Sequence, residues 1–254
     1  MDRGETAERT WQASPELLAL VSDAPHRAVQ RFGPVVAADL GVRFPWGLRA
    51  HPGAAPVDAS DAADALRWCE RRDRGSGWSM CLPAALPVPA PWRELRVLDE
   101  LPTFASAPDR LAVDHVPVPA GVTLSTTPSH EDVVTAYGAW MQDDDLARRL
   151  VVPDDLALAQ RSFIVAFLDD RAIGCAFVWW AVGTAYLSGI GVAPQHRGRG
   201  IGHALTLAAC QVAVTRTGHG TVPDVIWMHA TDEGAALYAR MGFERIGSEL
   251  HLAE

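Results

Sequence analysis

A glycine-rich turn between an apolar run and a helical repeat most constrains what this chain can fold into. The apolar run covers residues 185–192 and stops at Pro194, and the turn Gly198-Arg-Gly-Ile-Gly202 follows. Beyond the turn, apolar side chains recur at helical spacing on one face. A helix that starts here leaves its first N–H groups without internal partners at its positive end. With Arg197 and Arg199 at the rim, the pattern predicts an anion cradle for a pyrophosphate.

Single residues exclude several other kinds of site. A Walker A loop needs Gly-Lys-Ser/Thr, and the sequence contains no lysine. The missing lysine also excludes a lysine-bound pyridoxal phosphate. A dinucleotide fingerprint needs G-x-G-x-x-G, whereas Gly189-Ile-Gly191 is followed by Val192, Ala193 and Pro194. No G-x-S-x-G elbow occurs, which removes the common serine-hydrolase interpretation.

Two motifs of this sequence resemble the GNAT superfamily of N-acetyltransferases. The loop from Arg197 to Gly202 is similar to the R/Q-x-x-G-x-G/A signature. A register that starts at Gln195 also fits, but the later one places the V-x-P step of the family on Val192-Ala-Pro194. The second motif, Leu237-Tyr-Ala-Arg-Met-Gly-Phe243, is similar to the L-Y-x-x-x-G-F end of a late helix. The two motifs follow the family order, one helix and one strand apart.

The resemblance implies a site for acetyl-CoA as acetyl donor. Tyr238 falls where the family keeps the general acid that protonates the departing thiolate. The strand glutamate that many relatives use is missing, so His229 at the end of that strand is the candidate base. The alternatives are a packed aromatic for Tyr238 and a packed histidine for His229. The implied cofactor-binding residues are Ile190, Gly191 and Val192 along the pantetheine arm, and Arg197, Gly198, Arg199, Gly200, Ile201, Gly202 and His203 around the pyrophosphate.

The expected fold class is α/β (α+β), a mixed, mostly antiparallel sheet flanked by helices, as the resemblance implies. Residues 116–254 are expected to form the acetyl-CoA-binding N-acetyltransferase domain, with strands and helices in the family order. The expected strands are 122–126, 163–168, 173–182, 185–192 and 225–230, with a helix over 130–141, helical pieces in 146–160 and a helix after the glycine loop. Residues 1–115 form either a degenerate copy of the same fold, as in tandem members of the superfamily, or an unrelated helical cap. In this part we expect frayed first residues, helices over 14–21, 28–32, 61–72 and 91–101, and a strand over 78–82.

Composition limits the partners. A net charge of −9 argues against nucleic acid and anionic membranes, because both bind through excess positive charge. The four cysteines are scattered and the histidines show no ligand spacing, so no metal is assigned. No signal peptide or membrane span is recognised, and we expect a cytoplasmic protein from a GC-rich bacterial genome. The sequence leaves the oligomeric state open.

The function expected from the resemblance is direct transfer of an acetyl group from acetyl-CoA to a primary amine. The acceptor is a small molecule or a peptide, and its identity is open. The alternative is a regulatory or structural protein that binds acyl-CoA without turnover, because the strand glutamate is missing and the first half carries no glycine-arginine loop.

Overall fold

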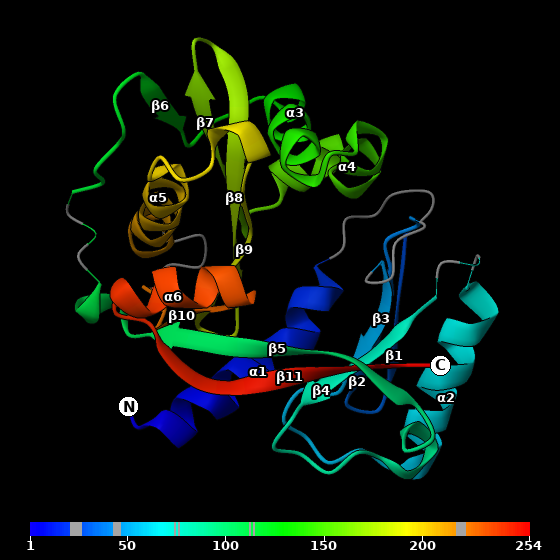
Figure 1. Cartoon of the computed structure of the whole chain (residues 1–254). Helices are drawn as coiled ribbons and strands as arrows, with labels where there is room; N and C mark the ends of the chain where they lie inside the picture. The colour runs from blue at the N-terminus through cyan, green and yellow to red at the C-terminus, as the bar shows by residue number, and fades with distance from the viewer. Residues whose placement is uncertain are drawn as a thin grey trace. The chain divides into compact units, whose positions relative to one another are not determined.

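The computed structural model describes residues 1–20, 27–42, 47–73, 75, 77–111, 113, 115–216 and 222–254. By their internal contacts these residues divide into two compact units. The first unit comprises Met1–Ala105, His229–Ala236 and Glu244–Glu254. The second comprises Ser106–Met228 and Leu237–Phe243. Each unit is described by itself, and Figure 1 shows the elements of both.

The elements of the first unit are, in chain order, α1 (Arg3–Ala19), β1 (Ala28–Phe32), β2 (Val35–Asp39), β3 (Leu48–His51), α2 (Ala59–Arg72), β4 (Ser79–Pro83), the short 3-10 helix η1 (Ala90–Trp92), β5 (Arg96–Ser106) and β11 (Glu244–Ala253). The strands follow the order β1-β2-β3-β4-β11-β5. β3 and β4 are parallel and are joined through α2, whereas β1, β2 and β3 pair antiparallel. β11 pairs antiparallel with both β4 and β5. This pairing explains why the last residues of the chain belong to the first unit.

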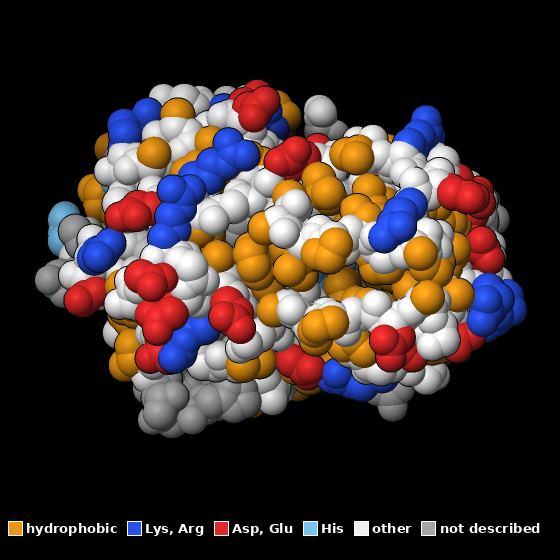
Figure 2. Space-filling model, turned by 90° about the horizontal axis from the view of Figure 1, so that it is seen from below, with side chains coloured by type: hydrophobic (Ala, Val, Ile, Leu, Met, Phe, Trp, Pro, Cys, Tyr) orange, Lys and Arg blue, Asp and Glu red, His pale blue; other side chains and the backbone are white. Residues whose placement is uncertain are grey.

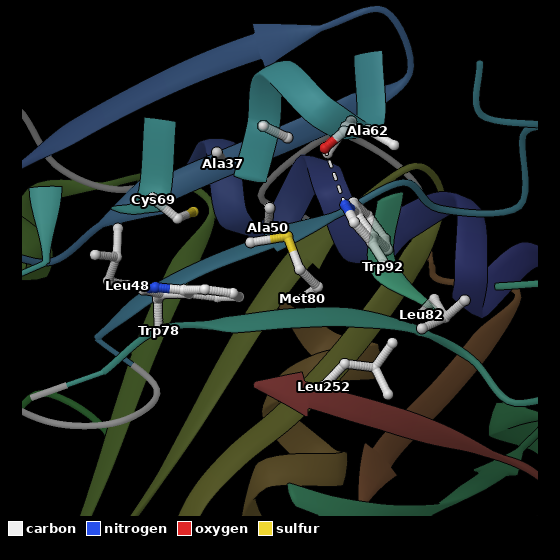
Figure 3. Packing of buried hydrophobic residues seen from close by; sticks show 12 residues of the cluster. Ala37, Leu48, Ala50, Ala62, Cys69, Trp78, Met80, Leu82, Trp92 and Leu252 are labelled. Atoms are coloured by element: carbon white, nitrogen blue, oxygen red, sulfur yellow. Dashed lines mark hydrogen bonds between the residues drawn. The ribbon is translucent and has the colours of Figure 1, made fainter. Parts of the chain in front are cut away.

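The two helices of the first unit cover opposite faces of its sheet. Leu18 of α1 packs with Val36 and Ala38 of β2, whose side chains alternate with those that face α2. On the α2 face the core is apolar, and Figure 3 shows Met80 near its centre. The indole Nε1 of Trp92, a fully buried side chain, donates a hydrogen bond of 2.9 Å to the Ala62 carbonyl of α2. This bond satisfies the buried donor that an indole brings into a core.

The elements of the second unit are, in chain order, the 3-10 helix η2 (Pro108–Arg110), β6 (Val122–Ser125), α3 (His130–Met141), α4 (Asp144–Leu150), η3 (Pro153–Ala157), β7 (Arg161–Leu168), β8 (Arg171–Ala181), β9 (Thr184–Val192), η4 (Pro194–His196), α5 (Ile201–Thr215), β10 (Val225–His229) and α6 (Asp232–Arg240). β10 and α6 each contribute residues to both units. The strand order is β10-β9-β8-β7-β6. Neighbouring strands from β6 to β9 pair antiparallel, and β9 and β10 pair parallel.

The sheet of the second unit is buried between α5 on one face and α3 with α4 on the other (Figure 1). β8 shows how the alternation of a strand serves both faces. Phe177 packs toward α3, with its ring centroid 5.1 Å from that of Tyr137. Trp180 points the other way, and its Nε1 donates to the Ala213 carbonyl of α5 at 3.3 Å. The sheet therefore holds α5 in a fixed place at the end of β9.

The structure confirms the predicted fold class, a mixed and mostly antiparallel sheet flanked by helices. It also has the helix predicted over 61–72, the strand over 78–82, and the predicted elements from residue 122 onward. The predicted boundary between residues 115 and 116 would give two domains, each of one continuous segment. Each of the two units instead contains segments from distant parts of the chain. The reason is that β11 completes the sheet of the first unit.

Three local predictions in the first part of the chain are wrong. α1 begins at Arg3, because Asp2 accepts from the Glu5 N–H and forms a capping box, so the first residues are helical rather than frayed. Val21, the end of the helix predicted over 14–21, lies outside the described residues. Residues 28–32, predicted as helix, form β1, and residues 91–101 form η1 and part of β5. Pairing with β2 makes residues 28–32 a strand, and pairing with β11 makes most of residues 91–101 a strand. Strand formation depends on cross-strand contacts more than on local propensity.

Two further features concern the surface charges and the hydropathy of the helices. On the face drawn in Figure 2, acidic and basic side chains are interspersed, and apolar side chains lie between them. Among the described residues, no helix combines the length and the hydropathy needed to cross a membrane.

Candidate functional site

The predicted cradle lies in the second unit, where β9 leads through η4 into α5. Gly198 and Gly200 hold φ angles of 73° and 80°, a left-handed backbone that favours glycine. Gly200 is the N-cap of α5, and having no side chain it makes no capping hydrogen bond. A Cβ built on Gly198 would have no atom within 4 Å. The loop thus leaves open space before the uncapped N-terminus of a 15-residue helix.

The charges around this helix start favour an anion. The first turn of α5 carries no acidic residue. Arg197 and Arg199 are both exposed in the loop. The Nε of Arg197 donates to the Val192 carbonyl at 3.2 Å and so ties the loop to the end of β9. Ile201 is buried and anchors the first turn, whereas Gly202 and His203 are partly exposed. A phosphate at this point would meet free N–H groups and positive charge.

The described pairing of β9 with β10 ends before the cradle. Their parallel register covers the pairs from Val225↔Thr184 to Trp227↔Tyr186, and it ends there in the described part of the chain. The rest of β9, which includes Ile190, therefore has no described partner in β10. On its other edge β9 stays paired with β8, with a register shift between Cys175 and Phe177. Backbone N–H and C=O groups left on the open edge are suited to the amide groups of an extended arm.

Gly191 has a packing reason as well as the predicted binding one. A Cβ at this position would lie 2.0 Å from the ring of Trp140 on α3. Real contacts are essentially never this short, so a side chain at position 191 would displace the Trp140 ring, and glycine is required here. The sequence analysis did not single out Trp140. Its ring fills the space where a side chain at position 191 would lie, so Gly191 can offer a ligand backbone groups alone.

Tyr238 lies on α6 and belongs to the second unit, as the cradle does. Its side chain is 8% exposed, and its ring meets that of Phe243 edge-on at 6.3 Å. Burial, with a smaller contribution from the Cys210 thiol of α5, raises the pKa of the phenol to about 12. The phenol therefore carries its proton throughout the neutral range. This is the state that a general acid needs.

His229 belongs to the first unit, where Glu249 is its main neighbour. Its Nε2 lies 3.3 Å from the Glu249 Oε2, and its Nδ1 lies 3.3 Å from the Thr103 Oγ1. Burial alone would raise the pKa of Glu249, but electrostatic attraction to the His229 and His51 rings and hydrogen bonds from His229 and His251 hold it well below the usual range. Both ring nitrogens of His229 are engaged, so a base role requires one of these contacts to be exchanged for substrate.

Sequence reasoning missed the carboxylate beside His229. Glu249 and His251 are two residues apart on β11 and so share one face. This alternation could have been read from the sequence, but the strand carries polar and apolar residues that resemble a surface strand. In the structure both side chains are almost fully buried, and His51 of β3 meets the same carboxylate at 3.0 Å. The candidate general acid and the candidate base are thus described in different units, each with its own neighbours.

Comparisons with known proteins concern the family and the fold. A family model described as an acetyltransferase (GNAT) domain matches residues 159–245. A mycothiol acetyltransferase from Mycolicibacterium gilvum is 34% identical over 124 residues, which are 46% of this chain and 39% of that protein. The chain therefore spans about two fifths of the length of the curated relative that it matches.

Solved structures match nearly the whole chain. A GCN5-related N-acetyltransferase from Kribbella flavida has a TM-score of 0.69 at 23% identity, with 98% of this chain and 95% of that chain covered. A tandem GNAT protein from the clavulanic acid biosynthesis pathway has a TM-score of 0.62 at 20% identity, with 99% and 95% covered. At such identities these likenesses concern the fold. The family model thus shows an acetyltransferase (GNAT) domain at residues 159–245, and the solved structures show that the chain has the fold of GNAT proteins.

Proposed function

We propose that the chain is an N-acetyltransferase that moves the acetyl group of acetyl-CoA directly to a primary amine. The observation that carries this proposal is the uncapped N-terminus of α5, with Gly198 and Gly200 in left-handed conformations and no acidic side chain in the first turn. The separated strands β9 and β10 support it, because their free edge suits a pantetheine arm. The proposed binding residues are Ile190, Gly191 and Val192, and Arg197 to His203.

In the proposed reaction, two side chains of the protein transfer protons. When bound, acetyl-CoA supplies a thioester whose carbonyl carbon the amine attacks. A C–N bond forms, the C–S bond breaks, and the amine loses a proton while the thiolate gains one. The raised pKa of Tyr238 keeps a proton available for that sulfur. His229, held by the buried carboxylate of Glu249, is the proposed acceptor of the amine proton.

The mycothiol acetyltransferase match supports a small molecule as acceptor, since that relative is named for acetyl transfer to mycothiol. We further propose that the chain is a soluble, cytoplasmic, bacterial enzyme that uses no metal in the transfer step. The division of labour that we propose gives residues 116–254 the acetyl-CoA site and residues 1–115 the role of a degenerate copy of the fold. The strand order of the first unit supports that role, because β3, α2 and β4 repeat the parallel pair and helix of β9, α5 and β10.

A second candidate is acyl-CoA binding without turnover. It is favoured by the strand of β10, which carries no glutamate, and by the engagement of both ring nitrogens of His229. The test is incubation of the full chain with acetyl-CoA and a panel of primary amines, with free thiol and acetylated amine measured by colour reaction and mass spectrometry. Equal release of thiol and product supports the enzyme. Tight acetyl-CoA binding with no acetylated amine across the panel would establish the second candidate.

A further inference from the structure

The sheet of the first unit has two chemically different faces. The α2 face is an apolar core that includes Met80, Leu82 and Leu252 (Figure 3). Side chains at the alternate positions point to the α1 face, where β2 contributes the apolar Val36 and Ala38 but β4 and β11 contribute buried polar and titratable groups. Three of them are Cys81, Glu249 and His251, each at most 7% exposed. Burying such groups is costly unless they are paired or bind a metal, and these three groups meet one another and the histidines His51 and His229.

Sheet register brings these side chains together. Cys81 of β4 and His251 of β11 are direct cross-strand partners, although 170 residues separate them in the sequence. Glu249 lies two residues before His251 on the same face of β11. The thiol Sγ of Cys81 is 3.6 Å from the Nδ1 of His251. One ligand atom from each of the three residues lies within 4.8 Å of the others.

These distances are close to those of a metal site. Zinc bonds of about 2.3 Å to sulfur and about 2.0 Å to nitrogen, at a tetrahedral angle, separate the two ligand atoms by about 3.5 Å. The distance of 3.6 Å between the Cys81 Sγ and the His251 Nδ1 is close to this value. The Oε1 of Glu249 now contacts the His251 Nε2 at 3.0 Å, so the Glu249 side chain has to turn away from this contact to reach a metal held by Cys81 and the His251 Nδ1.

We propose that Cys81, Glu249 and His251 bind one Zn²⁺ between the sheet and α1. A thiolate and a carboxylate together carry two negative charges, so a divalent cation with a neutral imidazole makes the buried cluster neutral. Sulfur excludes Mg²⁺ and Ca²⁺, which take oxygen ligands, while zinc accepts sulfur, nitrogen and oxygen together. The sequence analysis assigned no metal because spacing along the chain gives no sign of ligands that strand pairing brings together.

The second oxygen of Glu249 is already held by two histidines. The Gly53 N–H donates to the His51 Nδ1 at 2.8 Å, so the proton of a neutral His51 lies on Nε2. This Nε2–H donates to the Glu249 Oε2 at 3.0 Å, and the His229 Nε2 lies 3.3 Å from the same atom. Carboxylates that bind metals are commonly oriented by such outer hydrogen bonds. The arrangement holds Oε2 and leaves Oε1 to turn toward the metal.

The test uses the full chain without a polyhistidine tag, incubated with Zn²⁺ and then desalted. Mass spectrometry of the retained metal should find about one zinc per chain. Cys81→Ser should lose this zinc, and Glu249→Gln should retain at least about tenfold less. Cys69→Ser is the matched control, because Cys69 is a buried thiol of the same unit that faces the apolar core, and this variant should bind as the unaltered chain does. Circular dichroism checks the fold of each variant.

Cobalt gives a readout that does not depend on the variants being stable. Co²⁺ bound to the unaltered chain should show the charge-transfer absorption of a cobalt–thiolate bond, which Cys69→Ser keeps and Cys81→Ser loses. A chelator should lower the melting temperature of the unaltered chain and of Cys69→Ser. An unaltered chain that retains no zinc and shows no thiolate band would disprove the proposal and leave a metal-free hydrogen-bonded cluster. Zinc binding by Cys81→Ser at the level of the unaltered chain would disprove it equally, because the metal would then lie elsewhere.

Discussion

The parallel strand pairs of the two units share a topology and differ in the loop that leads to the helix. In the first unit β3 leads to α2, and in the second β9 leads to α5. The helix α2 starts after Asp58 and has Asp61 in its first turn, whereas α5 starts after Gly200 with no acidic residue in its first turn. Carboxylates at a helix N-terminus compete with an anionic ligand for the same positive end. The topology is therefore common to both units, and the loop chemistry predicts which of them binds a phosphate.

The aromatic residues that follow the parallel strand pairs, Trp92 after β4 and Tyr238 after β10, also differ in their chemistry. After β4, the indole of Trp92 is fully buried against α2 and donates to a backbone carbonyl (Figure 3). After β10, Tyr238 packs beside Cys210 of α5 and carries a phenol that can give up a proton. An indole N–H is a hydrogen-bond donor only. The first unit thus uses this position for stability, and the second offers a group with acid chemistry.

The largest expected effect is the loss of CoA affinity in Gly200→Asp. This change places on α5 the kind of carboxylate that α2 already has near its N-terminus. Two unit charges about 4 Å apart near a surface repel by about 4 kcal/mol, so the dissociation constant should rise about a thousandfold in calorimetry. Gly200→Asn is the matched control, because it brings the same size and backbone strain at a φ of 80° without the charge. Equal affinities of the two variants would mean that no phosphate lies at Gly200.

The next effect is a loss of turnover in Tyr238→Phe. Removing one general acid costs about a hundredfold or more, and CoA affinity should stay unchanged because the ring still packs. Tyr137→Phe, a change to another tyrosine of the same unit, should keep normal rates. Because burial raises the pKa of Tyr238 to about 12, turnover of the unaltered chain should not fall through loss of this proton up to about pH 10. A Tyr238→Phe enzyme with full activity on its acceptor would assign the residue to packing, as for Trp92 in the first unit.

The comparison also shows which parts of the fold a single sequence reveals. From residue 122 onward the periods of the strands and helices are regular, and α3 begins and ends where the sequence predicts. In the first unit the leucines at 95, 98 and 101 follow a helical spacing, yet most of this segment pairs with β11 as β5. The partner strand lies about 150 residues away in the chain, so no local pattern can report it.

In the candidate site, too, the sequence predicts local features and misses contacts between distant segments. The loop from Arg197 to His203 is contiguous, and a local motif therefore predicts its conformation, including the left-handed glycines. The neighbours of His229 come from β5 and β11, far apart in sequence, and Glu249 was missed for this reason. Trp140 was missed similarly, because its contact with Gly191 joins α3 to β9. A sequence motif can therefore predict a site whose residues lie in one segment. It cannot predict a site whose residues are brought together by strand pairing.

A smaller effect is expected for Arg199→Gln. Arg199 is exposed in the loop, so its attraction for a pyrophosphate is screened by water. Exposed charge contacts contribute about 0.5–1 kcal/mol, so CoA affinity should fall about two- to fivefold at low salt and the difference should shrink at high salt. Arg71→Gln removes the same charge from an exposed position near the end of α2 and should leave affinity unchanged. Equal losses in the two variants would point to net charge rather than to a contact at the cradle.

The smallest expected difference is in stoichiometry, one CoA per chain rather than two. Both units have a strand, a loop and a helix in the right order, so topology alone would allow a second site. The loop before α2 lacks the glycine-arginine turn, and the carboxylates of Asp58 and Asp61 lie at the helix start. Removing both charges in Asp58→Asn with Asp61→Asn should therefore leave calorimetric stoichiometry at one, because repulsion is relieved but no cradle is created. Two CoA bound by the unaltered chain would show that the first unit is a working copy, and two bound only by the double variant would show that the acidic residues alone separate the units.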